Sequence, residues 1–353
     1  MTCANNLRSI GLAVHNYHDT HNRLPTQLTG TFDPHSDRGG FQAPHHNQRQ
    51  LSGFVGLLPF MEQQPLREQI RSGDETWSPM GPPPWVREYD PWQTEVSLLR
   101  CRADGVEGLP AHGRTNYAFC LGDAVHWLNT GPTRFVSSEH RWVTDRRRQV
   151  DVSGRGCFVP RRPLSFRDIT DGLNHTAMLG EILTHDESAD IRTCGHLTVD
   201  WSDVLNRPNL VDDEKWRSAD QPMVWCPDSP VPDALAGRPN DQRRGYRWAD
   251  GAALYTGFNT ILPPNREIFL AGGDAGIGML PPSSRHPGGV HIAMADASVQ
   301  FVSDSIDAGD PAAPTVQWHP GEELPAEPVA SPYGVWGAMG TRAAEESPSE
   351  TKP

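Results

Sequence analysis

The first segment of the chain carries the clearest hydrophobic pattern. Between Cys3 and Asp19, apolar side chains recur at alternating steps of four and three residues, and polar side chains occupy most other positions. This spacing is typical of an amphipathic α-helix whose single apolar stripe must be covered by the rest of the chain. We expect Pro25 to close the segment, because the residue before a proline disfavours helical backbone. The stripe consists of Cys3, Leu7, Ile10, Val14 and Tyr17.

Short apolar runs further along the chain predict β-strands. The strongest signal is at 290–302, where alternation stops at Asp296 and Ala297 and then resumes, as in a β-hairpin. Further strand candidates are 115–121, 157–164 and 176–183. One amphipathic helix with several short strands predicts the α+β class, an N-terminal helix packed on an antiparallel sheet with long loops and inserts.

Changes in composition divide the chain into regions. We assign residues 1–27 to the N-terminal helix and 28–307 to a β-rich globular body, with an insert around 186–245 that is rich in charges and tryptophans. Residues 308–332 are a proline-rich segment, and 333–345 regain apolar residues. Residues 346–353 are polar, and we expect a disordered tail there.

Composition and charge narrow the classes of function. A chain of 353 residues with 36% hydrophobic residues can bury a proper core, and 33 glycines with 33 prolines favour a loop-rich, sheet-rich body. The net charge of -13 argues against a nucleic-acid partner, since phosphate binding depends on clustered Lys and Arg. We interpret the basic run 146–148 as a solvated loop. No apolar run approaches the roughly 20 residues of a membrane span, so we expect the chain as printed to be soluble.

The six cysteines lie at wide spacing without a C-x-x-C pair, which fits either buried thiols or disulfides that close long loops. The sequence alone does not give their connectivity. For a protein outside the cytoplasm we expect at least one bridge within the set Cys101, Cys120, Cys157, Cys194 and Cys226.

Common enzyme signatures are absent from the sequence. There is no phosphate-binding loop, dinucleotide fingerprint, H-E-x-x-H or G-x-S-x-G motif, so we predict no catalytic residue, no cofactor and no metal. Histidine pairs and loop carboxylates could in principle bind metal or move protons. We favour hydrogen-bonded surface histidines and aspartates that bond their own turn backbone. The residues concerned are His15, His18, His35, His45, His46, Asp168, Asp171 and 185–187.

A series of blocks in register resembles the bacterial DUF1559 family, often labelled prepilin-type or H-X9-DG proteins and sometimes extracellular solute-binding proteins. The resemblance spans essentially the whole chain, from the N-terminal helix to a terminal block at 333–345. The blocks are 3–19 with 23–25, 57–64, 115–117, 166–172 with 180–181, 248–251 with 258–265, 285–290 with Asp296, and 336–342.

The resemblance implies a pilin-like N-terminal helix and a non-enzymatic, pseudopilin-like structural or secretion-associated protein outside the cytoplasm, membrane-anchored. Family members carry a prepilin leader and an anchor helix just upstream of the position of Cys3, and neither stands there in this sequence. We therefore expect contact with a membrane only through a helix that is missing here. The implied partners are other pilin-like subunits or secretion machinery.

An alternative is an extracellular solute- or glycan-binding protein. The chain has eleven tryptophans, and indole rings can form stacking platforms for sugars. Exposure of these rings in a cleft would favour binding, whereas their burial would favour a structural role. The candidate rings are Trp85, Trp92, Trp201, Trp216 and Trp225.

The motif that gives the family its label comprises His286, Gly288, Gly289 and Asp296. A strand advances about 3.3 Å per residue, so His286 and Asp296 should lie at opposite ends of the strand between them. We predict two structural roles: His286 and the following turn lead into the strand, and Asp296 caps the hairpin turn. Ala297 stands where the family usually has glycine, so the turn should be either strained or lengthened.

Overall fold

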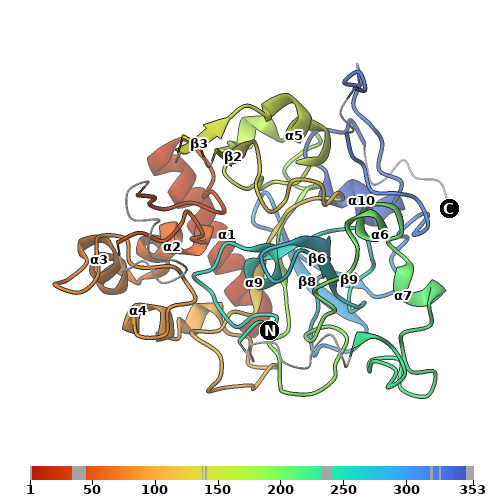
Figure 1. Ribbon diagram of the computed structural model, residues 1–353, viewed down its shortest axis with the longest axis horizontal. Helices are drawn as coiled ribbons and strands as arrows, with labels where there is room; N and C mark the ends of the chain where they lie inside the picture. Colours follow the sequence, from red (N-terminus) through yellow and green to blue (C-terminus); the bar gives the residue numbers. More distant parts are fainter. Residues whose placement is uncertain are drawn as a thin grey trace.

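The centre of the fold is one long helix lying on a five-stranded sheet (Figure 1). The computed structural model describes residues 2–33, 45–136, 138–139, 141–231, 241–318, 321–325 and 327–346. Helix α1 spans Thr2–His21. The strands, in spatial order, are β5 (Gly257–Phe258), β1 (Tyr117–Cys120), β4 (Ala177–Glu181), β8 (Gly289–Met294) and β9 (Val299–Ser303). Neighbours pair antiparallel except for β1 with the short β5, which are parallel. The predicted α+β class is confirmed.

The apolar stripe of α1 is buried as its spacing predicts. Leu7, Ile10 and Val14 are 0% exposed. One side of the helix contacts β4, β8 and β9, and another contacts α2 (Gly53–Leu57) and η2 (Leu58–Met61). Burying each of these three side chains contributes about 1.5 to 3 kcal/mol relative to exposure. The helix ends at His21, ahead of Pro25, so the predicted closure of the segment is also confirmed.

The opposite face of the sheet is covered by α10 (Gly334–Gly340), drawn in blue on the far side of the sheet from α2 and α3 in Figure 1. Alternate residues of β8 divide between the two sides. Val290, Ile292 and Met294 pack in a core with Trp336, whereas Ala293 belongs to the core beneath α1. The apolar residues at 333–345 therefore cover the face of the sheet that lies opposite α1.

The remaining elements are short and surround this centre. The region predicted as an insert, 186–245, contains α6 and α7, and α6 packs on the small β6–β7 sheet. A second small sheet is formed by β2 and β3. The elements are α3 (Gln64–Ser72), α4 (Asp90–Gln93), η3 (Ser97–Leu99), β2 (Thr133–Val136), β3 (Arg141–Thr144), α5 (Arg147–Ser153), η4 (Phe166–Asp168), α6 (Trp201–Asn206), α7 (Leu210–Asp213), α9 (Ala253–Thr256), β6 (Phe269–Ala271) and β7 (Ile277–Met279).

The strand predicted at 157–164 is wrong. The segment forms only an isolated bridge between Val159 and Arg162, although it is mostly buried. Pro160 and Pro163 interrupt it, and a proline has no N–H to donate to a ladder. The other three strand predictions correspond to β1, β4 and the β8–β9 hairpin and are confirmed.

The part of the C-terminal segment that the structure describes extends one residue beyond the predicted boundary, to Glu346. The Glu346 carboxylate accepts a hydrogen bond from the Ser331 N–H at 2.8 Å, and the Asp171 carboxylate accepts from the N–H groups of Ala344 and Glu345. Glu346 is therefore part of the folded body. The rest of the predicted tail, 347–353, lies outside the described residues.

The β8–β9 turn adopts the strained one of the two predicted alternatives. Asp296 Oδ1 accepts a hydrogen bond from the Ser298 N–H at 2.8 Å, so the predicted capping role is confirmed. Ala297 has φ +64°, the left-handed conformation that favours glycine. Its side chain is buried against Gly11 of α1, where a methyl group added to Gly11 would lie 3.1 Å from the Ala297 Cβ.

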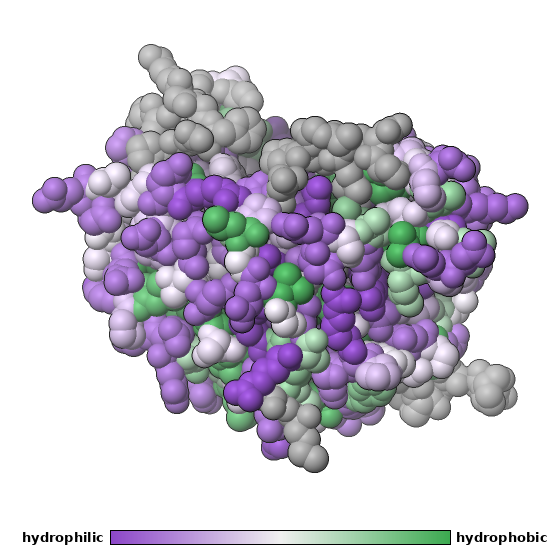
Figure 2. Space-filling view, turned by 90° about the horizontal axis from the view of Figure 1, so that it is seen from below, coloured by the Kyte–Doolittle hydropathy of each residue, from purple (hydrophilic) through white to green (hydrophobic). Residues whose placement is uncertain are grey.

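The exterior is mainly hydrophilic on the face that Figure 2 presents, where apolar side chains form small separate patches. This agrees with a chain of net charge -13 whose apolar residues are largely taken up by the two cores.

Replacing Ile10 with Asp should unfold the protein or lower its free energy of unfolding by about 3 kcal/mol or more, because an unpaired carboxylate would enter the core. Leu12 on the same helix is 51% exposed, so Leu12→Asp is the matched control and should change stability little. Thermal melting of the two variants measures the difference. An Ile10→Asp protein that melts within a degree or two of the wild type would refute the packing described for α1.

Replacing Ala297 with Gly should raise the free energy of unfolding by a few tenths to about 1 kcal/mol. Relief of the left-handed conformation contributes about 1 to 2 kcal/mol, and the loss of one buried methyl group opposes it by about 0.8 kcal/mol. Gly11→Ala should be neutral or harmful alone but stabilising in the Ala297→Gly background, where its contact is gone and the helix propensity gain of up to about 1 kcal/mol remains. Denaturant titration of the double-mutant cycle tests this, and strict additivity would contradict it.

Candidate functional site

A buried carboxylate at the end of β4 gathers two histidines and a disulfide around it. Glu181 Oε1 lies 3.2 Å from His286 Nε2, and Glu181 Oε2 lies 3.1 Å from His291 Nδ1. The Glu181 side chain is 2% exposed, and those of His286 and His291 are 23% and 21% exposed. The Cys101 Sγ lies 3.8 Å from His286 Nε2. We call Glu181, His286, His291 and the Cys3–Cys101 disulfide the Glu181 cluster.

The sheet and one turn bring these residues together. The antiparallel register pairs Gly180 with Ile292, so Glu181 ends β4 beside His291, whose backbone N–H donates to Glu181 Oε2 at 2.7 Å. His286 lies in the turn before β8, where its N–H donates to Ser284 Oγ. Gly288 has φ +80°, and a side chain on Gly289 would meet the Val302 carbonyl oxygen at 2.1 Å. Both glycines are therefore required for the turn to enter the strand.

The disulfide joins the first turn of α1 to the loop after η3. Cys3 and Cys101 are bonded, with 98 residues of sequence separation. The Tyr117 hydroxyl donates to the Cys3 carbonyl oxygen at 3.0 Å, and the Cys101 N–H donates to Asn116 Oδ1 at 2.9 Å. The start of α1 is thereby tied to β1 and its preceding loop as well as to Glu181 and its neighbours.

The predicted bridge within the set Cys101, Cys120, Cys157, Cys194 and Cys226 is therefore wrong. Cys101 is bridged, but its partner is Cys3, which lies outside that set and 98 residues away, so no local pattern links the two. Cys120, Cys157 and Cys194 are buried free thiols, and Cys226 is a half-buried one. Burial raises the pKa of Cys120 to about 12 and that of Cys194 above its ordinary value. Such thiols are poor nucleophiles.

Electrostatics explain why the Glu181 cluster is compact. A carboxylate out of water must be matched by hydrogen-bond donors, and Glu181 has one backbone N–H and two imidazoles within 3.2 Å. The edge of the His291 ring also packs against His286. Burial, and then the negative charge of Glu181, raise the pKa of Tyr117 well above its ordinary value, so its hydroxyl remains a donor.

The donor set of the Glu181 cluster resembles that of a zinc site but is not free to act as one while the disulfide is intact. One ligand atom from each of Cys3, Cys101, Glu181 and His286 lies within 4.8 Å of the others. Two thiolates, an imidazole and a carboxylate are ligands that Zn²⁺ accepts. With the sulfur atoms bonded to each other, Glu181 and His286 are the two members that retain their ligand atoms.

The label motif thus combines a confirmed prediction with a missed one. His286 and Asp296 serve different ends of β8, as predicted: Asp296 caps the turn, and the His286 turn leads into the strand. The contact of His286 with Glu181 was missed, since 105 residues separate the two in sequence. The available signal was a lone carboxylate that directly follows the buried apolar run of β4.

The five candidate tryptophans do not form one platform. Trp92 is 1% exposed and Trp225 is 3% exposed, so neither ring offers a face to a sugar. Trp85 and Trp216 are half-buried, and Trp201 on α6 is 45% exposed. Trp92 packs edge-on against Tyr89 and Trp248 in the core. A stacking role stays a prediction for the other three rings only.

Several of the other histidines and carboxylates considered from sequence make structural contacts. The prediction that Asp171 bonds its own turn backbone is wrong, because its carboxylate accepts from the distant N–H groups of Ala344 and Glu345. His15 and His18 both pack on the Phe166 ring, and His15 Nε2 lies 2.9 Å from the Ala295 carbonyl oxygen. Asp168 forms a capping box with Ser165. His185 contacts Thr193 Oγ1, and burial lowers its pKa to about 4. His45 is exposed, His46 is buried, and His35 lies outside the described residues.

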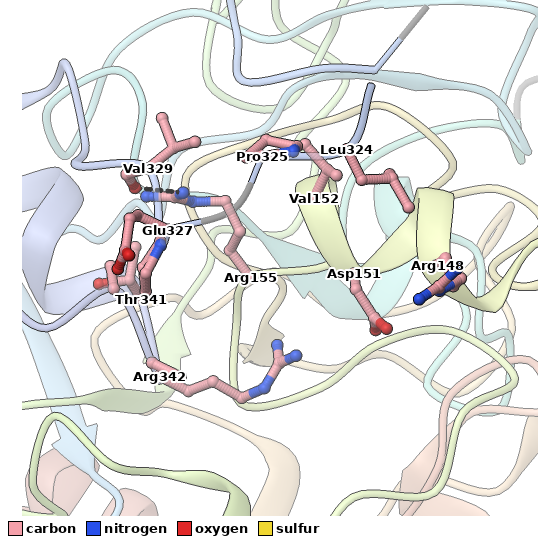
Figure 3. Close-up of a pocket in the computed structure, with 13 residues that line it drawn as sticks. Arg148, Asp151, Val152, Arg155, Leu324, Pro325, Glu327, Val329, Thr341 and Arg342 are labelled. Carbon is pink, nitrogen blue, oxygen red and sulfur yellow. Dashed lines mark hydrogen bonds between the residues drawn. The ribbon is translucent and has the colours of Figure 1, made fainter. Parts of the chain in front are cut away.

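The structure contains two further cavities apart from the Glu181 cluster. One of about 1230 Å³ opens between α1, η2 and the 95–108 loop, and Cys101, which is 6% exposed, is among its lining residues. Another of about 430 Å³ lies between α5 and the C-terminal segment (Figure 3). Figure 3 shows Arg155 directed at the Val329 carbonyl oxygen, and the same guanidinium pairs with Asp123 at 2.5 Å. Arg155 is therefore already neutralised.

A family model matches most of the chain. The family model SBP_bac_10, described as a protein of unknown function (DUF1559), matches residues 1–309. The match stops short of the terminal block at 333–345. No curated protein and no solved structure matches. Among the helices of the described residues, none is both long and apolar enough to span a bilayer.

We expect protein taken from its native compartment to contain the Cys3–Cys101 disulfide and four free thiols. Intact mass after alkylation in denaturant, with and without reductant, measures this, and six free thiols would contradict it. In the chain-entropy account, the Cys3→Ser/Cys101→Ser variant should lose about 4.7 kcal/mol of unfolding free energy, because the bridge closes a loop of 98 residues. Cys226→Ser, which removes a half-buried free thiol, is the control and should change stability little.

Proposed function

This chain belongs to the DUF1559 family, and on that premise we propose that it is a non-enzymatic, pseudopilin-like extracytoplasmic protein with a structural or secretion-associated role. The observation that carries the proposal is the way α1 is held. Its first turn is bonded to the body through Cys3–Cys101, and its apolar stripe lies on β4 and β8. A helix fixed at its start and laid along a sheet is the arrangement expected of a pilin-like subunit.

The exposed face of α1 is the surface that assembly would use. Leu12 is 51% exposed on the face away from the buried stripe, and Arg8 and Ser9 are exposed near it. An apolar residue flanked by polar ones suits contact between subunits that remain soluble when apart. The partner would be another pilin-like subunit or a component of a secretion machinery.

The disulfide supports the proposed location outside the cytoplasm. Structural disulfides persist in oxidising compartments and are rare in the cytosol, where thiols are kept reduced. Cys3 and Cys101 are 5% and 6% exposed, as is usual for a bridge that stabilises a fold. This supports a place outside the cytoplasm.

The absence of catalysis is also part of the proposal. A general base needs a free lone pair within reach of a substrate proton. Three contacts occupy the Glu181 carboxylate, which offers about four lone-pair sites, and the side chain is 2% exposed, so little of it is open to a substrate. This arrangement supports a structural role for Glu181: it holds the β4 end, the β8 start and the His286 turn together.

Solute or glycan binding through the tryptophans remains the alternative. Burial of Trp92 and Trp225 removes two of the five rings on which it rested. The cavities beside α5 and beside Cys101 are lined by none of the remaining three. We therefore place the structural role first.

Site-specific photo-crosslinking tests the proposal. A photoreactive phenylalanine analogue in place of Leu12, expressed in the source cells, should cross-link to a pilin-like subunit or to a second copy of the chain. The control is the same analogue in place of Leu109, which is 74% exposed on a loop. Leu12→Arg should abolish assembly with little change in the melting temperature, because Leu12 is 51% exposed and an arginine there can extend into water. Cross-links from neither position, or equal cross-linking from both, would count against assembly through α1.

A further inference from the structure

A third cavity, of about 340 Å³, is lined by four arginines and by no carboxylate among the residues that the structure describes. It lies between the end of α1, the loop that follows, and α3. The arginines are Arg23, Arg49, Arg67 and Arg161. Such a concentration of positive charge is unexpected in a chain of net charge -13.

Arg161 is buried without a counter-charge. It is 7% exposed, and its guanidinium donates to the carbonyl oxygens of Asn129, Thr130 and Arg49 at 3.2 to 3.4 Å. Its Nε is buried with no hydrogen-bond partner among the described residues. Among the residues that the structure describes, no carboxylate lies within salt-bridge distance of Arg161 or of Arg49. Neutral carbonyls satisfy donors but do not cancel a charge.

Trp142 holds the two central guanidinium groups. The Arg161 Cζ lies 4.3 Å and the Arg49 Cζ 5.5 Å from the centroid of its ring. A cation over an indole ring is attracted by the ring quadrupole while its charge is retained. The tryptophan therefore fixes the two arginines near each other at the cavity without neutralising them.

This arrangement has an electrostatic cost for Arg161. Burial, and then the positive charge of Arg49, lower the pKa of Arg161 to about 9. Burial also lowers the pKa of Arg49 and of Arg67 from the ordinary value. Desolvated like charges repel one another, and a bound anion would offset both the burial and the repulsion.

The cavity beside α5 offers a comparison, because it is also lined by a buried arginine. Arg155 there is paired with Asp123, which is fully buried, and the carboxylates of Asp151 and Glu327 line the same cavity. Of these two cavities, only the one at Arg161 lacks a carboxylate.

We propose that the cavity at Arg161 binds an oxyanion of the phosphate or sulfate type, either free or as the head group of a small solute, with Arg161 and Arg49 as its principal ligands. Guanidinium forks match such oxyanions in charge and geometry. The volume of about 340 Å³ exceeds a bare oxyanion, and Tyr17, Thr26 and Thr29, whose side chains carry hydroxyl groups, are among the residues that line it. These hydroxyls suit the polar body of a solute attached to the anion. This inference is independent of the structural role proposed above.

Isothermal titration calorimetry on the full chain in low-salt buffer tests the proposal. The probes are inorganic phosphate, inorganic sulfate and glucose 6-phosphate. We expect saturable binding of at least one probe. Arg161→Gln and Arg49→Gln should each weaken it about tenfold or more, since each removes charge-assisted hydrogen bonds. Tighter binding of the ester than of inorganic phosphate identifies a solute head group, and the reverse identifies the free ion.

The control is Arg8→Gln, which removes the same charge from an exposed position on α1 and should leave binding unchanged. Circular dichroism checks that each variant is folded. If Arg161→Gln does not fold, Arg67→Gln, at a half-buried position of α3, replaces it in the binding comparison. No saturable binding of any probe up to about 10 mM would overturn the proposal. Equal weakening by Arg8→Gln would also overturn it, because binding would then follow net charge alone.

Discussion

Leu7, Ile10 and Val14 lose all contact with water once α1 lies on β4 and β8, and the other elements are arranged around that contact. An isolated helix of 20 residues with a central glycine is marginally stable in water. Gly11 lies where the β8–β9 turn approaches the helix, and a Cβ added there would lie only 3.1 Å from the Ala297 Cβ. The helix therefore depends on the sheet for stability, and the sheet depends on the helix to cover one of its faces.

The Glu181 cluster joins the same two partners by polar and covalent means. Cys3 and Cys101 fix the first turn of α1, and His286 next to Cys101 contacts the carboxylate that ends β4. A buried charge that depends on several donors has few alternative arrangements, because losing any donor leaves the carboxylate unsatisfied. Apolar packing gives α1 its stability, and the Glu181 cluster fixes its register on the sheet.

Local patterns in the sequence were sufficient for α1 and for the β8–β9 hairpin, because periods of about 3.6 and 2 residues are properties of neighbouring positions. They failed at 157–164, where apolar residues suggested a strand but Pro160 and Pro163 removed the donors that a ladder requires. Contacts over long separations were not accessible. Cys3 and Cys101 are 98 residues apart, and Glu181 and His286 are 105 apart, so no periodicity links them. The arginines at the third cavity are likewise scattered from residue 23 to residue 161.

Among the described residues, buried arginines differ in whether a carboxylate balances their charge. Arg247 is buried but is surrounded by the carboxylates of Asp241 and Asp250, and Arg155 has Asp123, so each of these cations is neutralised where it stands. At the third cavity, the partial negative charge nearby is the C-terminal end of α1, equivalent to roughly half an elementary charge. That is small against the charge of the four guanidinium groups that line the cavity. Arg244 is also buried with carbonyl oxygens as its partners, so the burial of Arg161 among carbonyls is not by itself a sign of binding. What distinguishes Arg161 is that it lines a cavity of about 340 Å³ together with three other arginines, which favours a ligand that brings negative charge.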